Sequence, residues 1–380
     1  MPFEFIKNRL TEQHDKDRYR RRYHVAQQSS RELHINGKCY LNFSSNDYLG
    51  LNNHPKINKA MQEGIDKYGL CASASSLITG YQYPHQALED EICTWLNKSR
   101  CLLYSSGFAA NLGVLQTLGQ DENTAFFLDK LSHASLIDGA LSANAKVKRF
   151  LHNDTAQLER YLEQASTENK LIVSEGVFSM DGDKANISEL CQLANEYNAW
   201  SYIDDAHSIG VIGKQGEGSI SEGNIDIIMA TFGKAIATSG AFVACDENLF
   251  EYLVNFSRHY IYSTAISPAL AWATKASIEI IQKEHWRREK ITELSHLLSS
   301  TLDAQVKLIT TQSSIHAIEI GSEIKTLEIC EKLKEMGIWL TAIRPPTVAK
   351  NSSRLRVTIC SNHNTSDISH LSNSINKVLS

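Results

Sequence analysis

The sequence predicts an α/β fold: a large domain built on a mostly parallel sheet covered by helices, then a small α+β domain. Two observations predict this arrangement. Between about residues 100 and 245, apolar runs typical of strands alternate with helical patterns, whereas the C-terminal residues mix strands and helices in a different order. Alternation of strands with helices indicates βαβ units, whose parallel strands are buried on both faces.

The expected elements follow in chain order. Residues 1–44 are highly charged and read as a helix that leads into a short strand pair near residues 33–43. In the large domain, residues 45–281, apolar runs predict strands at 101–104, 125–129, 171–175, 200–205, 225–231 and 241–245. One helical pattern then runs from Pro268 to about residue 284, and another to about 302. The small domain, residues 282–380, reads as strand, helix, strand, strand, helix: 314–321, 323–337, 339–343, 354–360 and 367–379.

The composition excludes several classes of protein. With 42% apolar and 21% charged residues, the chain is an ordinary globular one. Its 38 basic and 43 acidic side chains give a net charge of −5, which disfavours a nucleic-acid partner. No signal peptide is evident, and no apolar run reaches the ~18 residues that a membrane span needs. The eight cysteines form no CxxC pair, so reduced thiols and a cytoplasmic location are expected.

The run WSYIDDAHS delivers acidic and imidazole side chains at the carboxyl end of a buried strand, where open α/β sheets bind ligands. Asp204 and Asp205 point to opposite faces because side chains alternate along a strand. His207 shares a face with Asp205 if the strand continues, whereas a turn beginning at Ala206 would bring it to Asp204. Helix capping and loop hydrogen bonding are the alternative roles for these side chains.

Lys234 follows another apolar strand and is framed by apolar residues, with no other charge between residues 227 and 245. Such surroundings disfavour the ammonium form, so the pKa of this amine is expected to fall, which makes it a nucleophile able to form a Schiff base. A solvated surface lysine is the alternative.

Three further strand ends add polar groups. Ser105 and Ser106 precede a predicted helix over 108–116, whose free N–H groups would form an anion site, unless the serines only cap the helix. His133 follows a second strand, and Ser179 leaves a third. Together, an anion-binding helix start, a histidine, an aspartate and a lysine are what a pyridoxal phosphate site requires.

A series of motifs extends this prediction: LNFSSNDYLGL, HQALE, SGFAAN, LSHASL, EGVFSMDGD, DDAHS, TFGKA, IYST and AIRPPTV. In this order and spacing the chain resembles the α-oxoamine synthases, which are fold-type I pyridoxal 5'-phosphate (PLP) enzymes. The resemblance covers nearly the whole chain, from RRRY at 20–23 to the last helix. AIRPPTV, and RRRY followed by NFSSNDYLG, tilt it toward the members that act in biotin biosynthesis.

The resemblance implies roles for the residues at these positions. Lys234 would carry the cofactor as an imine and move the α-proton of the substrate, while Asp204 would pair with the pyridine nitrogen. His133 would stack on the ring and help to activate the acyl carbonyl, and His207 and Ser179 would contact the side of its phenolic oxygen. Three residues would hold the cofactor phosphate: Gly107, Phe108 and Thr231. Four would bind the substrates: Arg344 and Asn46 the amino-acid carboxylate, Arg20 and Thr347 the acyl donor.

The resemblance also implies an acyltransferase that condenses L-alanine with pimeloyl-CoA or pimeloyl-carrier protein, releasing 8-amino-7-oxononanoate, CO₂ and the free thiol. Fold-type I enzymes build their site at a dimer interface, so a homodimer is implied, with residues 262–264 as candidates to reach the neighbour's phosphate. No metal is expected.

Three departures from the family pattern leave the acyl donor open. CASASSLITG stands at 71–80 where glycines are common, AIAT at 235–238 where a second glycine is usual, and Ser208 follows DDAH in place of a glycine. Another α-oxoamine synthase, making an autoinducer-type amino ketone or 2-amino-3-oxobutyrate, is therefore one alternative. A cofactor-free structural or regulatory relative is another.

Overall fold

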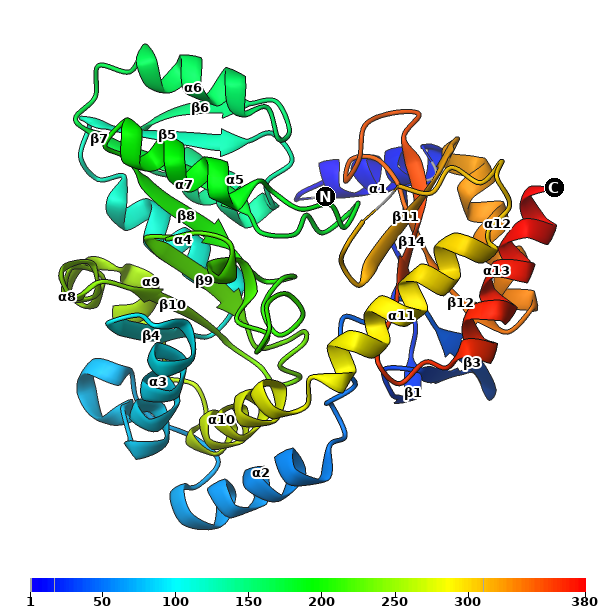
Figure 1. The fold of residues 1–380 in the computed structure, drawn as a ribbon, viewed down its shortest axis with the longest axis horizontal. Coiled ribbons are helices and arrows are strands. Elements are labelled where there is room, and N and C mark those ends of the chain that lie inside the picture. Colours follow the sequence, from blue (N-terminus) through cyan, green and yellow to red (C-terminus); the bar gives the residue numbers. More distant parts are fainter. Residues whose placement is uncertain (1, 17, 310) are drawn as a thin grey trace. The chain divides into compact units, whose positions relative to one another are not determined.

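The computed structural model describes residues 2–16, 18–309 and 311–380, which form two compact units (Figure 1). Unit 1 comprises Met1–Tyr48, Met180–Gly182 and Lys290–Ser380, and unit 2 comprises Leu49–Ser179 and Asp183–Glu289. The sequence-based boundaries were expected at 44/45 and 281/282. In the structure the N-terminal residues group with the C-terminal ones, because strand β3 (Lys38–Asn42) pairs in parallel with β12 (Ile338–Trp339).

Unit 2 is built on a seven-stranded sheet. In spatial order its strands are β4 (Arg100–Tyr104), β10 (Ala241–Cys245), β9 (Ile227–Thr231), β8 (Trp200–Asp204), β7 (Asn169–Glu175), β5 (Thr124–Asp129) and β6 (Lys146–Phe150). Strands β9, β8, β7, β5 and β6 pair in parallel, and β10 is antiparallel to both of its neighbours. The predicted mostly parallel α/β sheet is confirmed.

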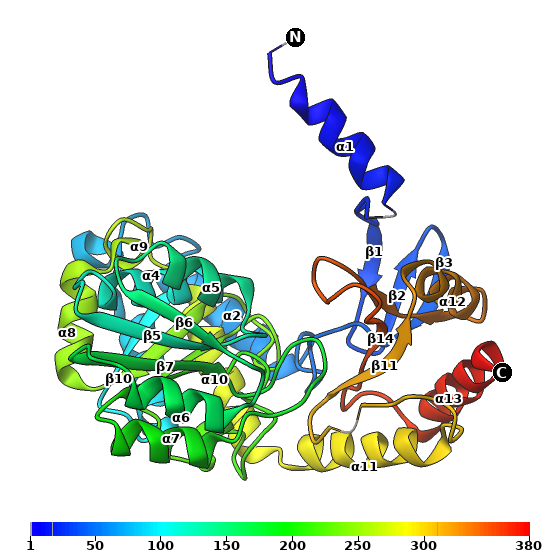
Figure 2. The same ribbon diagram turned by 90° about the horizontal axis from the view of Figure 1, so that it is seen from above.

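Helices cover both faces of this sheet. Figure 2 shows α4 (Gly107–Leu118) and α5 (Ala134–Leu141) on one side, and α6 (Thr155–Glu163) and α7 (Ile187–Glu196) on the other. The remaining helical segments of unit 2 are α2 (Pro55–Tyr68), η1 (Ser76–Gly80), α3 (Tyr83–Leu96), η2 (Gly218–Ser221), α8 (Glu247–Phe256), α9 (Arg258–Ile261) and α10 (Pro268–Lys283).

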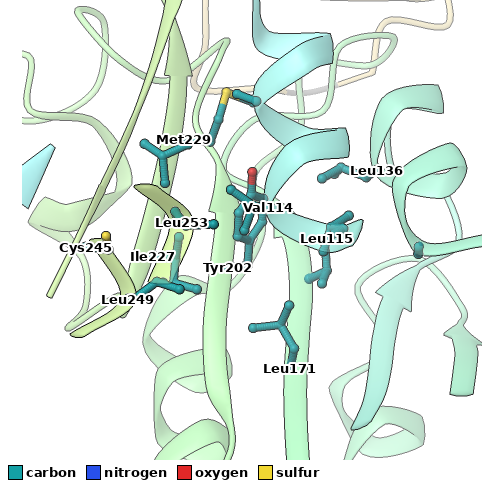
Figure 3. Close-up of a cluster of buried hydrophobic side chains, with 14 of the residues drawn as sticks. Val114, Leu115, Leu136, Leu171, Tyr202, Ile227, Met229, Cys245, Leu249 and Leu253 are labelled. Atoms are coloured by element: carbon teal, nitrogen blue, oxygen red, sulfur yellow. The ribbon is translucent and has the colours of Figure 1, made fainter. Parts of the chain in front are cut away.

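The core under α4 fixes this helix on the sheet (Figure 3). Val114 and Leu115 of α4 share a buried cluster with Tyr202 of β8 and Met229 of β9. Burying an aliphatic side chain of this size contributes about 1.5–3 kcal/mol. The helix is thereby anchored along its length, and its N-terminus is held at the carboxyl ends of the central strands.

One strand of this seven-stranded sheet, β6, was not predicted. Its sequence KVKRF carries three cations, and only Phe150 is buried. The strand lies at the edge of the sheet, paired with β5 alone. Lysine and arginine on an edge strand discourage pairing with other chains, but they also remove the apolar run that identifies a buried strand.

Unit 1 contains two small sheets. The first has the order β1 (Val25–Gln28), β2 (Glu32–Ile35), β3, β12, and the second has β11 (Ile315–Gly321), β14 (Ser353–Thr358), β13 (Thr341–Ile343). The strand expected over 339–343 is divided at Leu340, which is buried in the core of unit 1, so β12 and β13 join different sheets. The helices are α1 (Phe5–Asp15), α11 (Trp286–Thr301), which begins in unit 2, α12 (Glu323–Glu335) and α13 (Thr365–Leu379).

Within the described ranges, no helix combines the length and the apolar character that crossing a bilayer demands.

Candidate active site

A pocket of about 190 Å³ opens in unit 2 at the carboxyl ends of the parallel strands. Seven residues predicted from the sequence line it: Gly107, Phe108, His133, Asp204, His207, Thr231 and Lys234. Three side chains that the prediction did not assign also line it: Asn111, Ser135 and Glu175. The predicted Ser179 is half-buried in the same unit but does not belong to this lining.

The chain turns sharply after β8, and this turn determines which carboxylate faces the pocket. The Ala206 N–H donates to Asp204 Oδ1 at 3.0 Å, and Asp204 and His207 both line the pocket. Asp205 is fully buried and accepts hydrogen bonds from the backbone N–H and the hydroxyl of Ser219. Of the two arrangements that the sequence allowed, the structure therefore has the turn that brings His207 to Asp204.

Lys234 lies in the loop between β9 and β10. Its Nζ is 2.7 Å from His207 Nε2, which is close enough for a proton to pass between the two nitrogens. Phe232 and Ala235 on either side are fully buried, and the Thr238 N–H donates to the Phe232 carbonyl. The apolar frame predicted for this lysine thus anchors the loop and presents the half-buried amine to the pocket.

The anion site predicted from the sequence lies at the N-terminus of α4. Ser106 caps the helix by accepting a hydrogen bond from the Ala109 N–H at 3.2 Å. The N–H groups of Gly107 and Phe108 belong to the first turn, which has no intrahelical acceptors, and they lie at the positive end of the helix dipole. Thr231 lines the pocket beside them, so serine capping and anion binding are compatible here.

Asn111 connects the two ends of the pocket. Its Nδ2 donates to Asp204 Oδ2 and to Ser135 Oγ, both at 2.8 Å, and its Oδ1 accepts from the Tyr202 hydroxyl at 2.6 Å. Ser135 Oγ is in turn 2.7 Å from His133 Nδ1. One buried amide therefore orients both Asp204 and, through Ser135, His133. The spacing of four residues from Gly107, which puts Asn111 on the same helix face, is the signal that could have found it.

Glu175 at the end of β7 is the second unassigned group. Burial, and then the charge of Asp204, raise the pKa of its carboxyl well above the ordinary value. Its Oε1 is buried and has no hydrogen-bond partner among the described residues, although the residue lines the pocket. Buried polar atoms in native proteins are rarely left unpaired, so this oxygen indicates a ligand in the pocket.

His152 holds the base of the loop that follows β7. Its ring lies between two carboxylates, with Nδ1 3.1 Å from Asp129 Oδ1 and Nε2 2.7 Å from Asp183 Oδ2. Burial of the ring opposes protonation, but the hydrogen bonds to both aspartates outweigh it and raise the pKa of His152 to about 10. The imidazolium therefore ties the loop after β7 to the end of β5.

This raised pKa predicts a pH-dependent stability. Because the folded-state pKa of His152 exceeds the ordinary value of 6.5, its contribution is fully present below about pH 6.5 and is lost as the pH rises toward 10. We expect the melting temperature of the parent protein to exceed that of His152→Gln by more at pH 6 than at pH 9.5. Thermal denaturation of both proteins at both pH values measures this, and an equal gap would contradict it.

Apart from His133, the predicted substrate-binding residues belong to unit 1. Arg20 and Arg344 line one pocket of about 640 Å³. Asn46 Oδ1 accepts hydrogen bonds from the Tyr48 hydroxyl at 3.1 Å and from both terminal nitrogens of Arg356, at 3.3 and 3.4 Å. Thr347 lies in an exposed turn, where its N–H donates to the Arg344 carbonyl. The sequence reasoning did not assign Arg356, although it lies in the predicted strand RLRVTIC.

Two of the residues that stand where the family has glycines, Ser73 and Ala237, have a left-handed backbone. Ser73 has a φ of 63° and Ala237, three residues after Lys234, a φ of 59°. A glycine adopts this conformation without strain, whereas a residue with a Cβ pays about 1–2 kcal/mol. The chain has kept the backbone geometry in spite of the substitutions, so these two positions store strain next to functional segments.

Ala237→Gly is therefore expected to stabilise the protein by about 0.5–1 kcal/mol, since the relieved strain exceeds the ~0.5–1 kcal/mol entropic cost of a glycine. Urea denaturation of the two proteins measures the difference. Ala235→Gly is the matched control and should destabilise, because Ala235 is fully buried and its backbone is not left-handed. A less stable Ala237→Gly protein would contradict the strain argument.

Comparisons with known proteins identify the family. Residues 38–375 match the model of the family described as aminotransferase class I and II. The chain belongs to this family. The 8-amino-7-oxononanoate synthase of Photobacterium profundum is 41% identical over 98% of this chain and 96% of its own length.

Two solved structures extend the likeness to the fold. A serine palmitoyltransferase from S. paucimobilis with bound PLP–myriocin has a TM-score of 0.91 and 27% identity, covering 99% of this chain and 97% of that one. An 8-amino-7-oxononanoate synthase from Francisella tularensis has a TM-score of 0.78 and 29% identity, covering 90% of this chain and 98% of that one. The chain has the fold of the fold-type I PLP enzymes, as predicted.

As a member of this family, the chain uses pyridoxal 5'-phosphate. The residues of the unit 2 pocket fit that group. They provide an amine for the aldehyde, a buried carboxylate for the pyridine nitrogen and helix N–H groups for the phosphate. A bound group would also account for the buried Glu175 Oε1, which has no hydrogen-bond partner among the described residues.

Proposed function

We propose that this chain catalyses the decarboxylative condensation of L-alanine with a pimeloyl thioester to 8-amino-7-oxononanoate in biotin biosynthesis. The observation that carries the proposal is the assembly of Lys234, His207 and Asp204 in one pocket, in a chain 41% identical to a protein of that name. The eight free cysteines are consistent with a cytoplasmic location, which we also propose.

Lys234 and His207 are proposed as the proton-transfer pair. When bound, the cofactor supplies an electron sink for the charge that develops on the substrate's α-carbon. Lys234 would remove the α-proton and later return one, because its amine lies inside the pocket on a fixed loop. His207, at 2.7 Å, can accept from or donate to that amine and so adjust its protonation between steps.

Asp204 and His133 are proposed to hold the cofactor ring from two directions. Asp204 would face the pyridine nitrogen, held in place by the hydrogen bond that its Oδ2 accepts from Asn111. The exposed His133 ring is oriented by Ser135 at the start of α5 and lies edge-on to Phe108, with ring centroids 6.4 Å apart. Gly107, Phe108 and Thr231 are the proposed phosphate contacts, and Ser179 a proposed contact of the ring's oxygen side.

The amino-acid carboxylate is proposed to bind at Asn46 with Arg344 or with Arg356. Arg356 is the better supported partner, because it already hydrogen-bonds to Asn46 and is buried. Arg344 instead shares its pocket with Arg20. That pocket has room for part of a pimeloyl thioester, and its arginines suit either the distal carboxylate or the phosphates of coenzyme A. Thr347 is proposed for the same side.

Arg356→Lys tests the carboxylate assignment. A lysine keeps the positive charge but loses the two parallel N–H donors that match a carboxylate. We expect KM for L-alanine to rise about tenfold or more, corresponding to the loss of a charge-assisted hydrogen bond worth about 1.5–3 kcal/mol. Steady-state kinetics with the thioester saturating measures this, and KM for the thioester should hardly change. An unchanged KM for alanine would favour Arg344 as the residue that binds the amino-acid carboxylate.

We further propose a homodimer. The segments 71–80 and 262–266 lie side by side, since Ser75 forms a β-bridge with Thr264 and the Ala265 N–H donates to the Ala74 carbonyl. Together they expose large apolar side chains, with Ile78 76% and Tyr262 71% exposed. Exposed apolar groups gathered on two adjacent segments favour a covered interface. Mixing Lys234→Ala with Thr264→Ala subunits should restore some activity if Thr264 reaches the partner's site.

Product analysis decides between this function and its nearest alternative. Purified protein is incubated with pimeloyl-CoA or pimeloyl-carrier protein as the acyl donor. L-alanine, glycine or L-serine is added as the amino acid, and the products are identified by mass spectrometry. We expect 8-amino-7-oxononanoate from alanine only. A different amino ketone as the main product would favour another α-oxoamine synthase, for which the non-glycine residues at 71–76 are the supporting observation.

A further inference from the structure

Three metal-ligating side chains meet on the hairpin of β2 and β3, in unit 1 and outside the proposed active site. The ligand atoms of Glu32, His34 and Cys39 all lie within 4.8 Å of one another. Over the described parts of the chain, no other group of three or more histidine, cysteine, aspartate or glutamate side chains comes this close. From the sequence, no metal was expected.

The hairpin register brings these side chains together. Asn36 and Gly37 have φ values of 52° and 75°, as a two-residue hairpin turn requires. This turn makes His34 and Cys39 direct cross-strand partners, and such partners have Cβ atoms about 4.5–5.5 Å apart. Glu32 precedes His34 by two residues and therefore lies on the same face of the sheet.

The opposite face of the hairpin fixes this orientation. Its side chains form a small apolar core: Leu33, Ile35 and Tyr40. A slip of one residue in the register would expose these three residues and bury the polar set, which costs free energy. The cluster is therefore a consequence of the fold and not of flexible side chains meeting by chance.

The three ligand atoms suit zinc better than other metal ions. A thiolate sulfur, an imidazole nitrogen and a carboxylate oxygen are all ligands of zinc, at bond lengths of about 2.0–2.3 Å. The side chains are half-buried or exposed, so small rotamer changes can close the remaining distance. Arg31 Nη1 lies 2.7 Å from Glu32 Oε1, which leaves Oε2 for a metal. Arg31 also donates to both carboxylate oxygens of Asp367, so its charge is already balanced there.

We propose that Glu32, His34 and Cys39 bind one zinc ion, with water as the fourth ligand. None of the three belongs to the cofactor pocket of unit 2. The site is thus independent of the reaction, and its test does not depend on the proposed function.

The test is the reactivity of Cys39 in the PLP-loaded enzyme. The protein is treated with iodoacetamide with and without zinc chloride, and alkylation of each cysteine is followed by peptide mass spectrometry. Cys71 lies in the segment proposed for the dimer interface, so Cys330, which is partly exposed and outside the hairpin, is the internal control. We expect zinc to slow alkylation of Cys39 at least tenfold and to leave the rate at Cys330 unchanged.

His34→Gln and Glu32→Gln separate a three-ligand site from a single thiolate that captures zinc alone. Both replacements are of half-buried side chains, and an unchanged cofactor absorbance shows that each variant is folded. We expect protection of Cys39 to disappear in His34→Gln and to weaken in Glu32→Gln. The proposal is overturned if zinc leaves the Cys39 rate unchanged, if Cys330 is protected equally, or if His34→Gln retains full protection.

Discussion

Lys234→Ala is expected to abolish condensation, with a fall in kcat on the order of 10⁴-fold or more, because both the covalent attachment and the proton transfer depend on this amine. Its Nζ lies in the cofactor pocket, 2.7 Å from His207. Product formation is measured by mass spectrometry with L-alanine and a pimeloyl thioester. Treatment of the parent protein with borohydride should add the mass of the cofactor to the peptide that contains Lys234.

Lys130→Ala is the matched control for this prediction. Lys130 is exposed in the loop after β5, close in sequence to His133, but it does not line the pocket. Its removal should leave activity and borohydride labelling unchanged. If Lys234→Ala keeps measurable turnover, or if the label appears on another lysine, the assignment of the reacting amine is wrong.

The strand ends could be predicted from the sequence because the evidence for them is local. A buried apolar run identifies a strand, and the polar residue after it must lie at the edge of the sheet; Lys234 and Asp204 were found in this way. Whether His207 joins Asp204 or Asp205 could not be decided from the strand pattern, because the answer depends on the turn at Ala206 that Asp204 itself stabilises. The edge strand β6 was missed because its charged residues conceal the pattern.

The supporting side chains could not be predicted because their roles exist only in three dimensions. Asn111 contacts Asp204, which is 93 residues away in the sequence, and Glu175 has its raised pKa only because burial and Asp204 surround it. Likewise, Arg356 gains its significance from a contact with Asn46 across 310 residues. Each of these side chains, read alone, is an ordinary helix or strand residue.

Asp204→Asn is expected to lower kcat by about 10²- to 10³-fold. The amide removes the fixed negative charge of the pocket, which would stabilise the charge that develops on the cofactor ring during the reaction. The replacement keeps the size of the side chain and an oxygen that can accept from Asn111, so the pocket should keep its shape. Cofactor loading, measured by absorbance and by borohydride labelling at Lys234, should therefore persist. The loss should appear in kcat, with little change in KM for L-alanine.

Asp205→Asn is the control for this prediction. It tests whether activity is lost because the charge at the pocket is removed or because any buried carboxylate in this loop is removed. Asp205 is the next residue and is equally buried, but it faces Ser219 and does not line the pocket. Burial raises the pKa of its carboxyl to about 6, so the neutral amide is a mild replacement. Its effect on kcat should be small. If both variants lose activity equally, the two aspartates act through the fold of the loop, and the direct role of Asp204 at the cofactor ring is refuted.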